Sequence, residues 1–321
     1  MQHLWSIDGL GLSGSWLTIG SFDGVHLGHQ KIVNQIVHGA REDHVPSVVL
    51  TFYPHPGVVL GKRSGAFYLT TPEEKAQLLA EMGLDYMISH PFNRQLAQLS
   101  ARDFVSYLHQ RLGFKRLCIG SDFALGHNRE GDLPRLEQLG RQFGYRVQAL
   151  QPVTLDGRVV SSSWVRQALS EGDVSTVQRL LSRPYQISGE VVHGDGRGKT
   201  LGIPTANLEV WRERALLKPG VYAGWAAVDG SAHPAVSNIG YRPTFDQQEE
   251  YPHVEAHIID FDQDLYRKQV SLSFLFRLRD EQRFENIEGL VQQVHQDIEK
   301  ARSLLEVSRH ETISGIARPS S

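Results

Sequence analysis

The chain has 321 residues, of which 40% are hydrophobic, and a net charge of −3. This length predicts about two domains, and the near balance of 33 basic and 36 acidic side chains argues against a nucleic-acid-binding protein. The single cysteine excludes an internal disulfide, and without a signal-peptide core or a run of about 18 apolar residues the sequence predicts a cytoplasmic protein with no membrane partner.

The first clear element is a strand ending in Leu17-Thr18-Ile19, which a glycine-containing turn joins to a helix. His26 and His29 lie at the start of this helix, where residues three apart face the same way. N–H groups and the positive end of the helix dipole attract anions to such a first turn, so the stretch T-I-G-S-F-D-G-V-H-L-G-H predicts a phosphate site. Two histidines at this spacing, taken alone, are equally typical of a solvated pair or of half a metal site.

An earlier segment, Gly9–Gly14, has the formal G-x-G-x-x-G spacing of a dinucleotide-binding loop. Such a loop should follow a strand and open a helix, whereas here a strand comes after it. We therefore interpret this segment as a loop that binds no cofactor.

Between residues 46 and 150, apolar strand-like runs alternate with helical patterns. The strand at Pro46–Tyr53 stops at Pro54-His55-Pro56, and the strand at Lys115–Gly120 ends in a G-S-D-F-A-L-G loop that contains Asp122. This alternation predicts an α/β doubly wound parallel sheet, in which ligands bind at the carboxyl ends of the strands. The other expected elements are helices capped by Thr71 and Ser100 and ending near Met82 and Leu112, a helix at Leu133–Phe143, and strands at Tyr86–Ser89 and Tyr145–Leu150.

The pattern changes near Ser182-Arg183-Pro184, where a helix at Val174–Leu181 ends and short, partly alternating strands begin. These strands predict a small antiparallel β-barrel, closed off by an amphipathic helix at Asn286–Leu305. We expect domains at residues 1–183 and 184–308, and a disordered tail at 309–321. The expected barrel strands are Gln186–His193, Gly220–Val228, Ala232–Ile239, Val254–Ile259 and Val270–Arg277.

The segment G-D-G-R-G-K-T, residues 194–200, ends like a P-loop, but His193 stands where the first glycine of a P-loop is required. It leads instead into L-G-I-P-T-A-N-L. Thr205 and Asn207 alternate with Ala206, so an extended backbone would point both to one side. A hydroxyl and an amide oxygen on one face suit Mg²⁺, although a turn rich in hydrogen-bonding residues has the same composition.

Glu255 lies between Val254 and Ala256 on an expected strand, and so projects to the opposite face. If that face is the inside of the barrel, a carboxylate there is costly unless it is paired or functional. The acidic segment Asp260–Asp264 lacks the glycine and terminal glutamate of an EF-hand, and we interpret it as a turn.

Five motifs together resemble one enzyme family. G-S-F-D-G-V-H-L-G-H, T-F-Y-P-H-P, V-S-S-S-W-V-R, L-G-I-P-T-A-N and V-E-A-H occur here in the order found in the prokaryotic bifunctional riboflavin kinase/FMN adenylyltransferases, or FAD synthetases. The resemblance spans roughly residues 15–305. G-S-D-F-A-L-G is similar to the family's G-x-D-F-x-F-G, with Leu125 in place of the usual aromatic residue.

The resemblance implies two reactions, phosphorylation of riboflavin by ATP to FMN, and adenylylation of FMN by a second ATP to FAD. It implies Mg²⁺ as the metal and a Rossmann-like domain followed by a riboflavin kinase-like barrel; the oligomeric state stays open. The implied catalytic residues are Glu255, as general base, and His26, His29 and Arg166. The implied ATP- and phosphate-binding residues are Gly20, Phe22, Asp23, Gly24, Ser162, Ser163, Gly194, Gly196, Gly198, Lys199 and Gly202, the flavin-binding residues are Pro54, His55, Pro56 and Asp122, and the metal ligands are Thr205 and Asn207.

Plainer interpretations exist for some of these residues. Serines before a helix are ordinary caps, and Arg166 alone is typical of a solvated charge, whereas beside a phosphate site its guanidinium suits phosphate binding. Two rival functions also stay open: a cytidylyltransferase-like domain joined to an unrelated barrel, and a catalytically silent flavin-sensing protein.

Overall fold

A computed structural model of the chain describes residues 1–194, 198, 201–241 and 251–316, with side chains described as far as Val307. The chain divides into two compact units, Met1–Ser162 and Ser163–Ser321. The division comes at the start of the helix Ser162–Glu171 and before the helix Val174–Leu181, which the sequence pattern assigned to the first domain. The predicted domain boundary after residue 183 stays a prediction. No described helix is both long enough and apolar enough to span a membrane.

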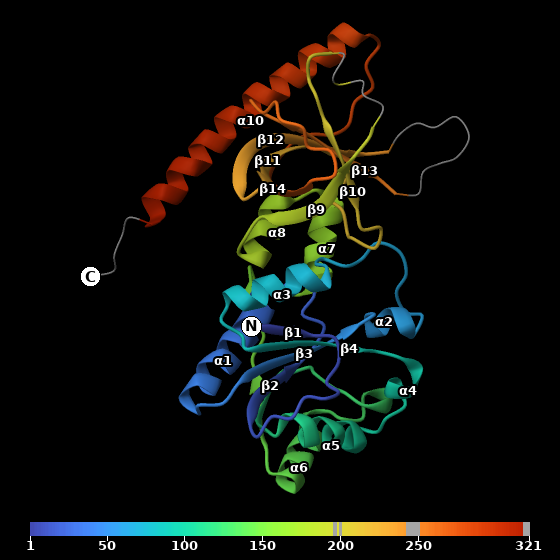
Figure 1. Cartoon of the computed structure of the whole chain (residues 1–321), viewed down its shortest axis with the longest axis vertical. Coiled ribbons are helices and arrows are strands. Elements are labelled where there is room, and N and C mark those ends of the chain that lie inside the picture. The colour runs from blue at the N-terminus through green and yellow to red at the C-terminus, as the bar shows by residue number, and fades with distance from the viewer. Residues whose placement is uncertain (195–197, 199–200, 242–250, 317–321) are drawn as a thin grey trace. The chain divides into compact units, whose positions relative to one another are not determined.

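The first unit is built on a six-stranded sheet in which every pairing is parallel (Figure 1). The spatial order of the strands is β1-β4-β3-β2-β5-β6. Their bounds are β1 Gln2–Leu4, β2 Ser15–Ile19, β3 Ser47–Tyr53, β4 Tyr86–Pro91, β5 Phe114–Gly120 and β6 Arg146–Leu150.

Helices cover both faces of this sheet. On one face, α1 (Leu27–Glu42) and α3 (Pro72–Glu81) pack on Trp16, Val49 and Met87; on the other, α5 (Ala101–Leu112) and α6 (Leu133–Phe143) pack on Leu17 and Val48. Neighbouring residues of one strand thus pack against helices on opposite faces of the sheet, because side chains alternate along a strand. This is the doubly wound sheet that the sequence predicts. The shorter elements of the unit are α2 Pro56–Val59, α4 Arg94–Ala97, the 3₁₀ turn η1 His127–Arg129, β7 Thr154–Leu155 and β8 Arg158–Val159.

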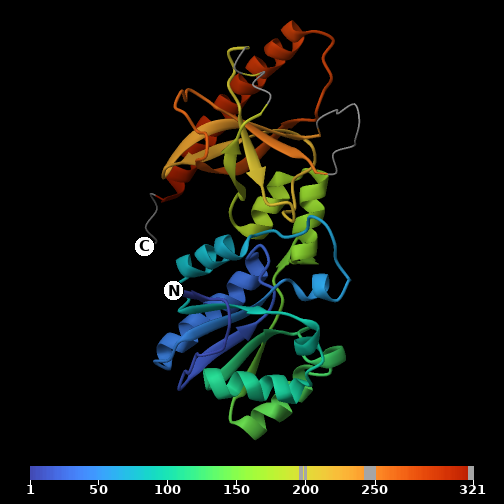
Figure 2. The same cartoon turned by 45° about the vertical axis from the view of Figure 1, so that its right-hand side comes forward.

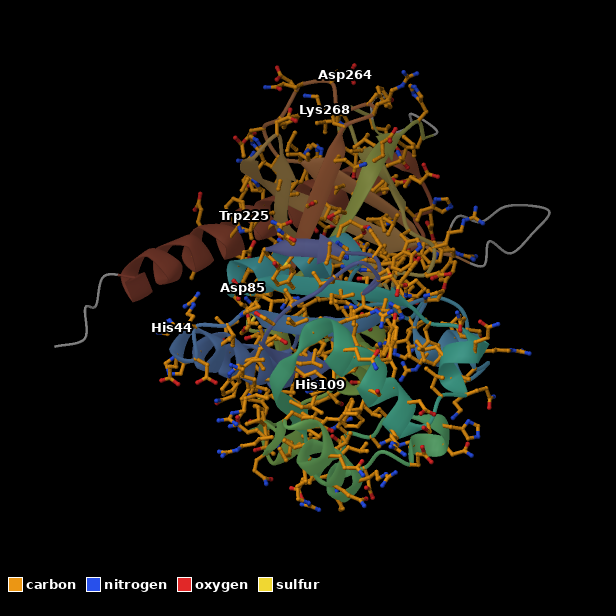
Figure 3. The ribbon with its side chains drawn as sticks, turned by 60° about the horizontal axis from the view of Figure 1, so that its bottom comes forward. His44, Asp85, His109, Trp225, Asp264 and Lys268 are labelled. Atoms are coloured by element: carbon orange, nitrogen blue, oxygen red, sulfur yellow. The ribbon has the colours of Figure 1, made fainter. Side chains whose placement is uncertain are left out.

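The strand order reverses direction between β2 and β5. From β2 the chain proceeds to β3 and β4 on one side, and then crosses to β5 and β6 on the other. In open α/β sheets, ligands bind outside the carboxyl ends of the strands at such a switch point. The loops that leave Ile19 and Gly120 both start at this point. At the amino ends of the strands, Asp85 links β3 to β4. Its carboxylate, labelled in Figure 3, accepts hydrogen bonds from the amide and hydroxyl of Ser47 at 2.9 and 2.7 Å.

The second unit contains a closed antiparallel barrel with the strand order β10-β13-β12-β11-β14-β9 (Figure 2). The helix α10 packs on the outside of β11, β12 and β14. Side chains at the end of the barrel include Lys268, labelled in Figure 3, which pairs with Asp229 at 2.7 Å. The bounds are α7 Ser162–Glu171, α8 Val174–Leu181, β9 Tyr185–Val192, β10 Ala206–Val210, β11 Gly220–Val228, β12 Ser231–Gly240, β13 His253–Ile258, β14 Gln269–Arg279 and α10 Ile287–Ile316.

The barrel and the sheet confirm the predicted fold class, and Cys118 is buried as expected. The prediction of the local elements was incomplete. The strands β1 and β10 were not predicted, and α10 continues past its expected end at Leu305 to Ile316, while the disordered tail at 309–321 stays a prediction. Within α10, Ile298, Ala301 and Leu305 are buried, but Ile287 is 61% exposed rather than part of the apolar face.

Candidate functional site

The first candidate site is the turn between β2 and α1, at the switch point of the sheet. Phe22, Gly24 and Val25 have φ values of 47°, 80° and 42°, in the left-handed region that β-branched and bulky residues rarely adopt. Such strained backbone persists only where its surroundings hold it, and it concentrates at functional sites. Phe22 is 1% exposed and packs beneath Gly20, where a Cβ would lie 3.1 Å from the Phe22 ring.

The buried carboxylate of Asp23 holds this turn. It accepts hydrogen bonds from the amides of Leu69 and Thr70 at 2.9 and 3.3 Å, while the Thr70 hydroxyl accepts one from the Gly24 amide at 3.2 Å. Leu69 also packs so tightly on Gly24 that a Cβ there would lie 2.8 Å from its side chain. These contacts indicate that Asp23 and Gly24 shape the turn. The motif alone did not distinguish this structural role from direct contact with phosphate.

His26 is the N-cap of α1, and its Nδ1 accepts a hydrogen bond from the His29 amide at 3.4 Å. The two imidazole rings stack with their centroids 3.7 Å apart. Because Nδ1 accepts, a neutral His26 carries its proton on Nε2, which is a donor suited to a phosphate oxygen. A Cβ at Gly28 would lie 3.1 Å from the His26 ring, so the glycine between the histidines leaves room for this arrangement. The structure thus brings the predicted histidine pair together at a helix N-terminus.

Ser162, at the first residue of α7, joins this site. Its hydroxyl donates a hydrogen bond to the carbonyl oxygen of Asp23 at 2.9 Å. Ser163 is exposed and Arg166 is half-buried one turn farther along α7, on the same helix face as Ser162. Both of these residues belong to the second unit.

The predicted flavin residues follow two strands of the sheet. Pro54 is exposed after β3, and His55 caps α2 by accepting a hydrogen bond from the Gly57 amide at 2.9 Å, with Pro56 opening that helix. The His55 amide donates to the Tyr68 hydroxyl at 2.8 Å. The rings around this segment are those of Trp5, Tyr53, Phe67 and Tyr68, and Trp5 is 49% exposed.

Asp122 lies exposed after β5, the strand beside β2 on the other side of the switch point. Arg129 donates to its carbonyl oxygen at 3.0 Å. Leu125, which replaces an aromatic residue of the family pattern, is 8% exposed and belongs to the core beneath α5 and α6. The replacement therefore fills apolar space there.

One functional candidate in this unit was missed from the sequence. Lys75, on α3, is 6% exposed, and its Nζ donates a hydrogen bond to the Ser21 carbonyl oxygen at 2.7 Å. Burial lowers the pKa of Lys75 to about 8, against an opposing effect of the Asp23 carboxylate. Its sequence neighbours, Glu74 and Ala76, are typical of an ordinary solvated helix position, so no local signal marked it.

The second candidate site lies on the barrel. Asn207 of β10 is directly opposite Glu255 of β13, and Glu255 is directly opposite Asn238 of β12. Directly opposed residues on antiparallel strands share one face of the sheet. The structure therefore places a carboxylate between two carboxamides.

This row of polar residues lies on the outer face of the barrel. Asn238 is opposite Val221, which packs in one apolar cluster with Ile298 and Ala301 of α10. The condition under which Glu255 would be costly, a position inside the barrel, is therefore not met. Glu255 is half-buried on the outside, and its buried neighbours Val254 and Ala256 face the interior.

Two glycines of the preceding loop lie against the predicted metal ligands. A Cβ at Gly194 would collide with the side-chain amide of Asn207, and one at Gly198 would lie 3.2 Å from the Thr205 hydroxyl. These two glycines therefore leave room for a hydroxyl and a carboxamide, an oxygen-donor set that fits Mg²⁺. His257 completes the segment by bonding the Pro204 carbonyl through Nδ1 at 2.8 Å. Gly202 is exposed with a φ of 74°, whereas Gly196 and Lys199 lie outside the described residues.

Comparisons with known proteins match both units. Residues 11–164 match the FAD synthetase family model, and residues 181–305 match the riboflavin kinase model. A crystal structure described as a macrolide-efflux protein from Streptococcus pneumoniae has a TM-score of 0.84 and 29% identity, covering 94% of this chain and 98% of its own.

Curated relatives span nearly the whole chain. The bifunctional riboflavin kinase/FMN adenylyltransferase of Pseudomonas fluorescens is 40% identical over 91% of this chain and 94% of its own. The Bacillus subtilis protein of the same name is 35% identical over 89% of this chain and 91% of its own. With both family models matched in order and this identity sustained along the chain, the protein belongs to the bifunctional riboflavin kinase/FMN adenylyltransferase family.

Proposed function

We propose that this protein makes FAD from riboflavin in two ATP-dependent steps. The barrel transfers the γ-phosphoryl group of ATP to riboflavin, giving FMN and ADP. The parallel-sheet unit then joins FMN to the α-phosphate of a second ATP, giving FAD and pyrophosphate. The observation that carries this proposal is that each family match contains its own cluster of polar side chains, the stacked His26 and His29 in the first and the aligned Asn207, Glu255 and Asn238 in the second.

The first step attacks with a neutral alcohol, so it needs a base. Glu255 is the candidate, because it is half-buried and has a carboxamide residue directly opposite it on both adjoining strands. A positioned general base contributes about 10²–10⁴-fold to such a rate. The glycine loop around Thr205 and Asn207 would hold the ATP phosphates, and Mg²⁺ bound by these two residues would neutralise phosphate charge.

The second step attacks with a phosphate that is already an anion, so no base is required. The protein must bring two anions together and stabilise charge that builds up on the α-phosphate. The stacked His26 and His29, at the positive end of α1, are suited to this task. Arg166 is the proposed partner of the leaving pyrophosphate, through charge-assisted bidentate hydrogen bonds. Ser162 and Ser163, in the first turn of the same helix, are proposed to bind phosphate oxygens.

For the flavin of the second step, we propose the aromatic surroundings of Pro54, His55 and Pro56. Planar rings stack favourably on aromatic side chains, and Tyr53, Phe67 and Tyr68 cluster beside this segment. Asp122, across the switch point, is the proposed polar contact to the flavin.

The direct test is to incubate the purified full chain with riboflavin and excess MgATP and to separate the products by chromatography. FMN should appear first and then be converted to FAD, with ADP and pyrophosphate released. A protein that bound riboflavin without forming either product would be the silent sensor. Nucleotidyl transfer from CTP, with neither FMN nor FAD formed, would support the cytidylyltransferase-like alternative.

A further inference from the structure

A buried lysine lies beneath the histidine turn of the first unit. Lys75 is on α3, 6% exposed, and its ammonium donates a hydrogen bond to the carbonyl oxygen of Ser21 at 2.7 Å. The hydroxyl of Thr51, on β3, donates to the same oxygen at 3.0 Å. Ser21 is the residue immediately before the strained positions Phe22–Val25, so two donors fix the entry to that turn.

One short segment of the chain holds the turn at both ends. The amides of Leu69 and Thr70 bind the Asp23 carboxylate, and Lys75, a few residues later, binds the Ser21 carbonyl. Between these contacts, Thr71 and Glu74 form a reciprocal capping box that starts α3 directly after the segment. The position of Lys75 is therefore coupled to the residues that shape the turn.

An apolar residue would fill this position at lower cost. Lys75 follows the α3 first turn and is adjacent to Ala76, which packs in the core with Val49 and Met87. Removing an ammonium from water is unfavourable, so a lysine here is expensive unless its charge is used. The charge faces the turn that leads to the histidine pair, which is where the triphosphate of ATP would bind.

We propose that Lys75 is a positioning residue for adenylyl transfer, whose ammonium fixes the Ser21–Val25 turn and adds positive charge beneath the phosphate site. The proposal rests on the adenylyltransferase activity proposed above and extends it to a residue outside the recognised motifs. It predicts that this step, and not riboflavin phosphorylation, depends on the charge of Lys75.

The charged groups around Lys75 set the direction of its pH response. Burial lowers its pKa to about 8, and the Asp23 carboxylate in the turn opposes this shift. The pKa of His3, on β1, also responds to this site. Burial is the largest influence and lowers that pKa, Glu73 of α3 raises it, and Lys75 lowers it. Lys75 is thus charged at neutral pH and loses its charge above about pH 8, so the adenylylation step should weaken as the pH rises through that value.

The test compares Lys75→Met with wild type in the full chain, measuring both activities separately. With FMN and MgATP, we expect kcat/KM for ATP at pH 7 to fall by about 10–100-fold, as for a small misplacement of catalytic groups. Riboflavin phosphorylation by the same preparation should stay within about twofold of wild type, and urea unfolding of the first unit serves as the control for folding. Lys115→Met removes an exposed lysine from the same unit and should leave both activities unchanged.

Two further variants separate charge from hydrogen bonding. In Lys75→Arg the charge no longer titrates, so the decline in adenylylation between pH 7.5 and 9 should disappear while activity is retained. In Thr51→Val the second donor to Ser21 is lost but Lys75 still titrates, so kcat should fall and the decline with pH should remain. These two variants decide the question if the first unit does not fold in Lys75→Met.

The proposal is overturned if Lys75→Met keeps the wild-type kcat/KM for ATP, or if Lys75→Arg shows the wild-type decline above pH 8. A wild-type protein that makes no FAD from FMN and MgATP would instead refute the proposed function, before any variant is compared.

Discussion

Asn207 of β10 and Glu255 of β13 are directly opposed across an antiparallel strand pair, on the outer face of the barrel. The two residues are far apart in the chain, and this register puts the candidate general base beside a candidate metal ligand. Asn238 occupies the equivalent position on the other side of Glu255 and donates through Nδ2 to Glu281 at 3.5 Å. The proposed kinase site is thus a row of side chains that the barrel register aligns.

The first prediction concerns Glu255. Glu255→Gln keeps the size and hydrogen-bonding capacity of the side chain but cannot accept the proton of an attacking alcohol. We expect riboflavin phosphorylation to fall by about 10²–10⁴-fold, while adenylylation of supplied FMN continues at the wild-type rate. Initial rates with each flavin substrate measure this. Glu209→Gln, at an exposed position of β10, is the matched control; loss of both activities in Glu255→Gln would contradict separate sites.

The second prediction concerns His29, which stacks on His26 at 3.7 Å. His29→Ala removes an imidazole from the helix N-terminus, so we expect adenylylation to slow by about 10²–10³-fold, as for other donors to a developing negative charge. FMN should accumulate when riboflavin and MgATP are supplied. His38→Ala, on the same helix with its side chain 76% exposed, should make FAD normally. Wild-type FAD production by His29→Ala would remove His29 from the mechanism.

The third prediction concerns the contact between Gly194 and Asn207. A methyl group at residue 194 would collide with the Asn207 carboxamide, so Gly194→Ala must move either the loop or the candidate ligand. We expect the KM for MgATP in riboflavin phosphorylation to rise at least tenfold and adenylylation to be unaffected, as steady-state kinetics would reveal. Gly11→Ala adds the same methyl group where nothing lies within 4 Å, and should change neither activity. An unchanged KM in Gly194→Ala would mean that this contact does not shape the ATP site.

The fourth prediction concerns Asp23. Asp23→Ala would leave the amides of Leu69 and Thr70 without the carboxylate that they bind, in a site where Asp23 is 1% exposed. Losing hydrogen bonds to a buried charged group costs about 3 kcal/mol, which urea unfolding of the first unit would detect. Asp23→Asn retains an acceptor oxygen and should recover part of the loss. Equal stability of Asp23→Ala and wild type would show that the turn is held by other contacts.

Local chemistry made much of the first site predictable. A histidine, glycine and histidine at helical spacing after a strand specify a helix N-terminus, and the structure has His26 as that N-cap. Ser100 and Thr71 were recognised as caps because their hydrogen bonds reach only three residues along the chain. Lys75 was not recognised, because its burial depends on β3 and the turn, which are distant in sequence.

The second site was predictable in composition but not in arrangement. β10 was missed because Pro204 and the polar residues Thr205 and Asn207 are as typical of a turn as of a strand. The face occupied by Glu255 was also beyond reach, because alternation along one strand says which residues share a face but not which face meets α10. That choice is made by long-range pairing in the closed barrel.

The barrel closes when its first strand, β9, pairs with its last, β14, with Tyr185 opposite Phe274. During synthesis the parallel sheet, complete by Leu150, therefore has all its strands long before the barrel can close. A polypeptide terminated ahead of β14 would retain an intact six-stranded sheet but leave β9 and β11 as open strand edges, which invite aggregation. Premature stop codons between β9 and β14 should thus yield insoluble product rather than a working adenylyl-transferring fragment.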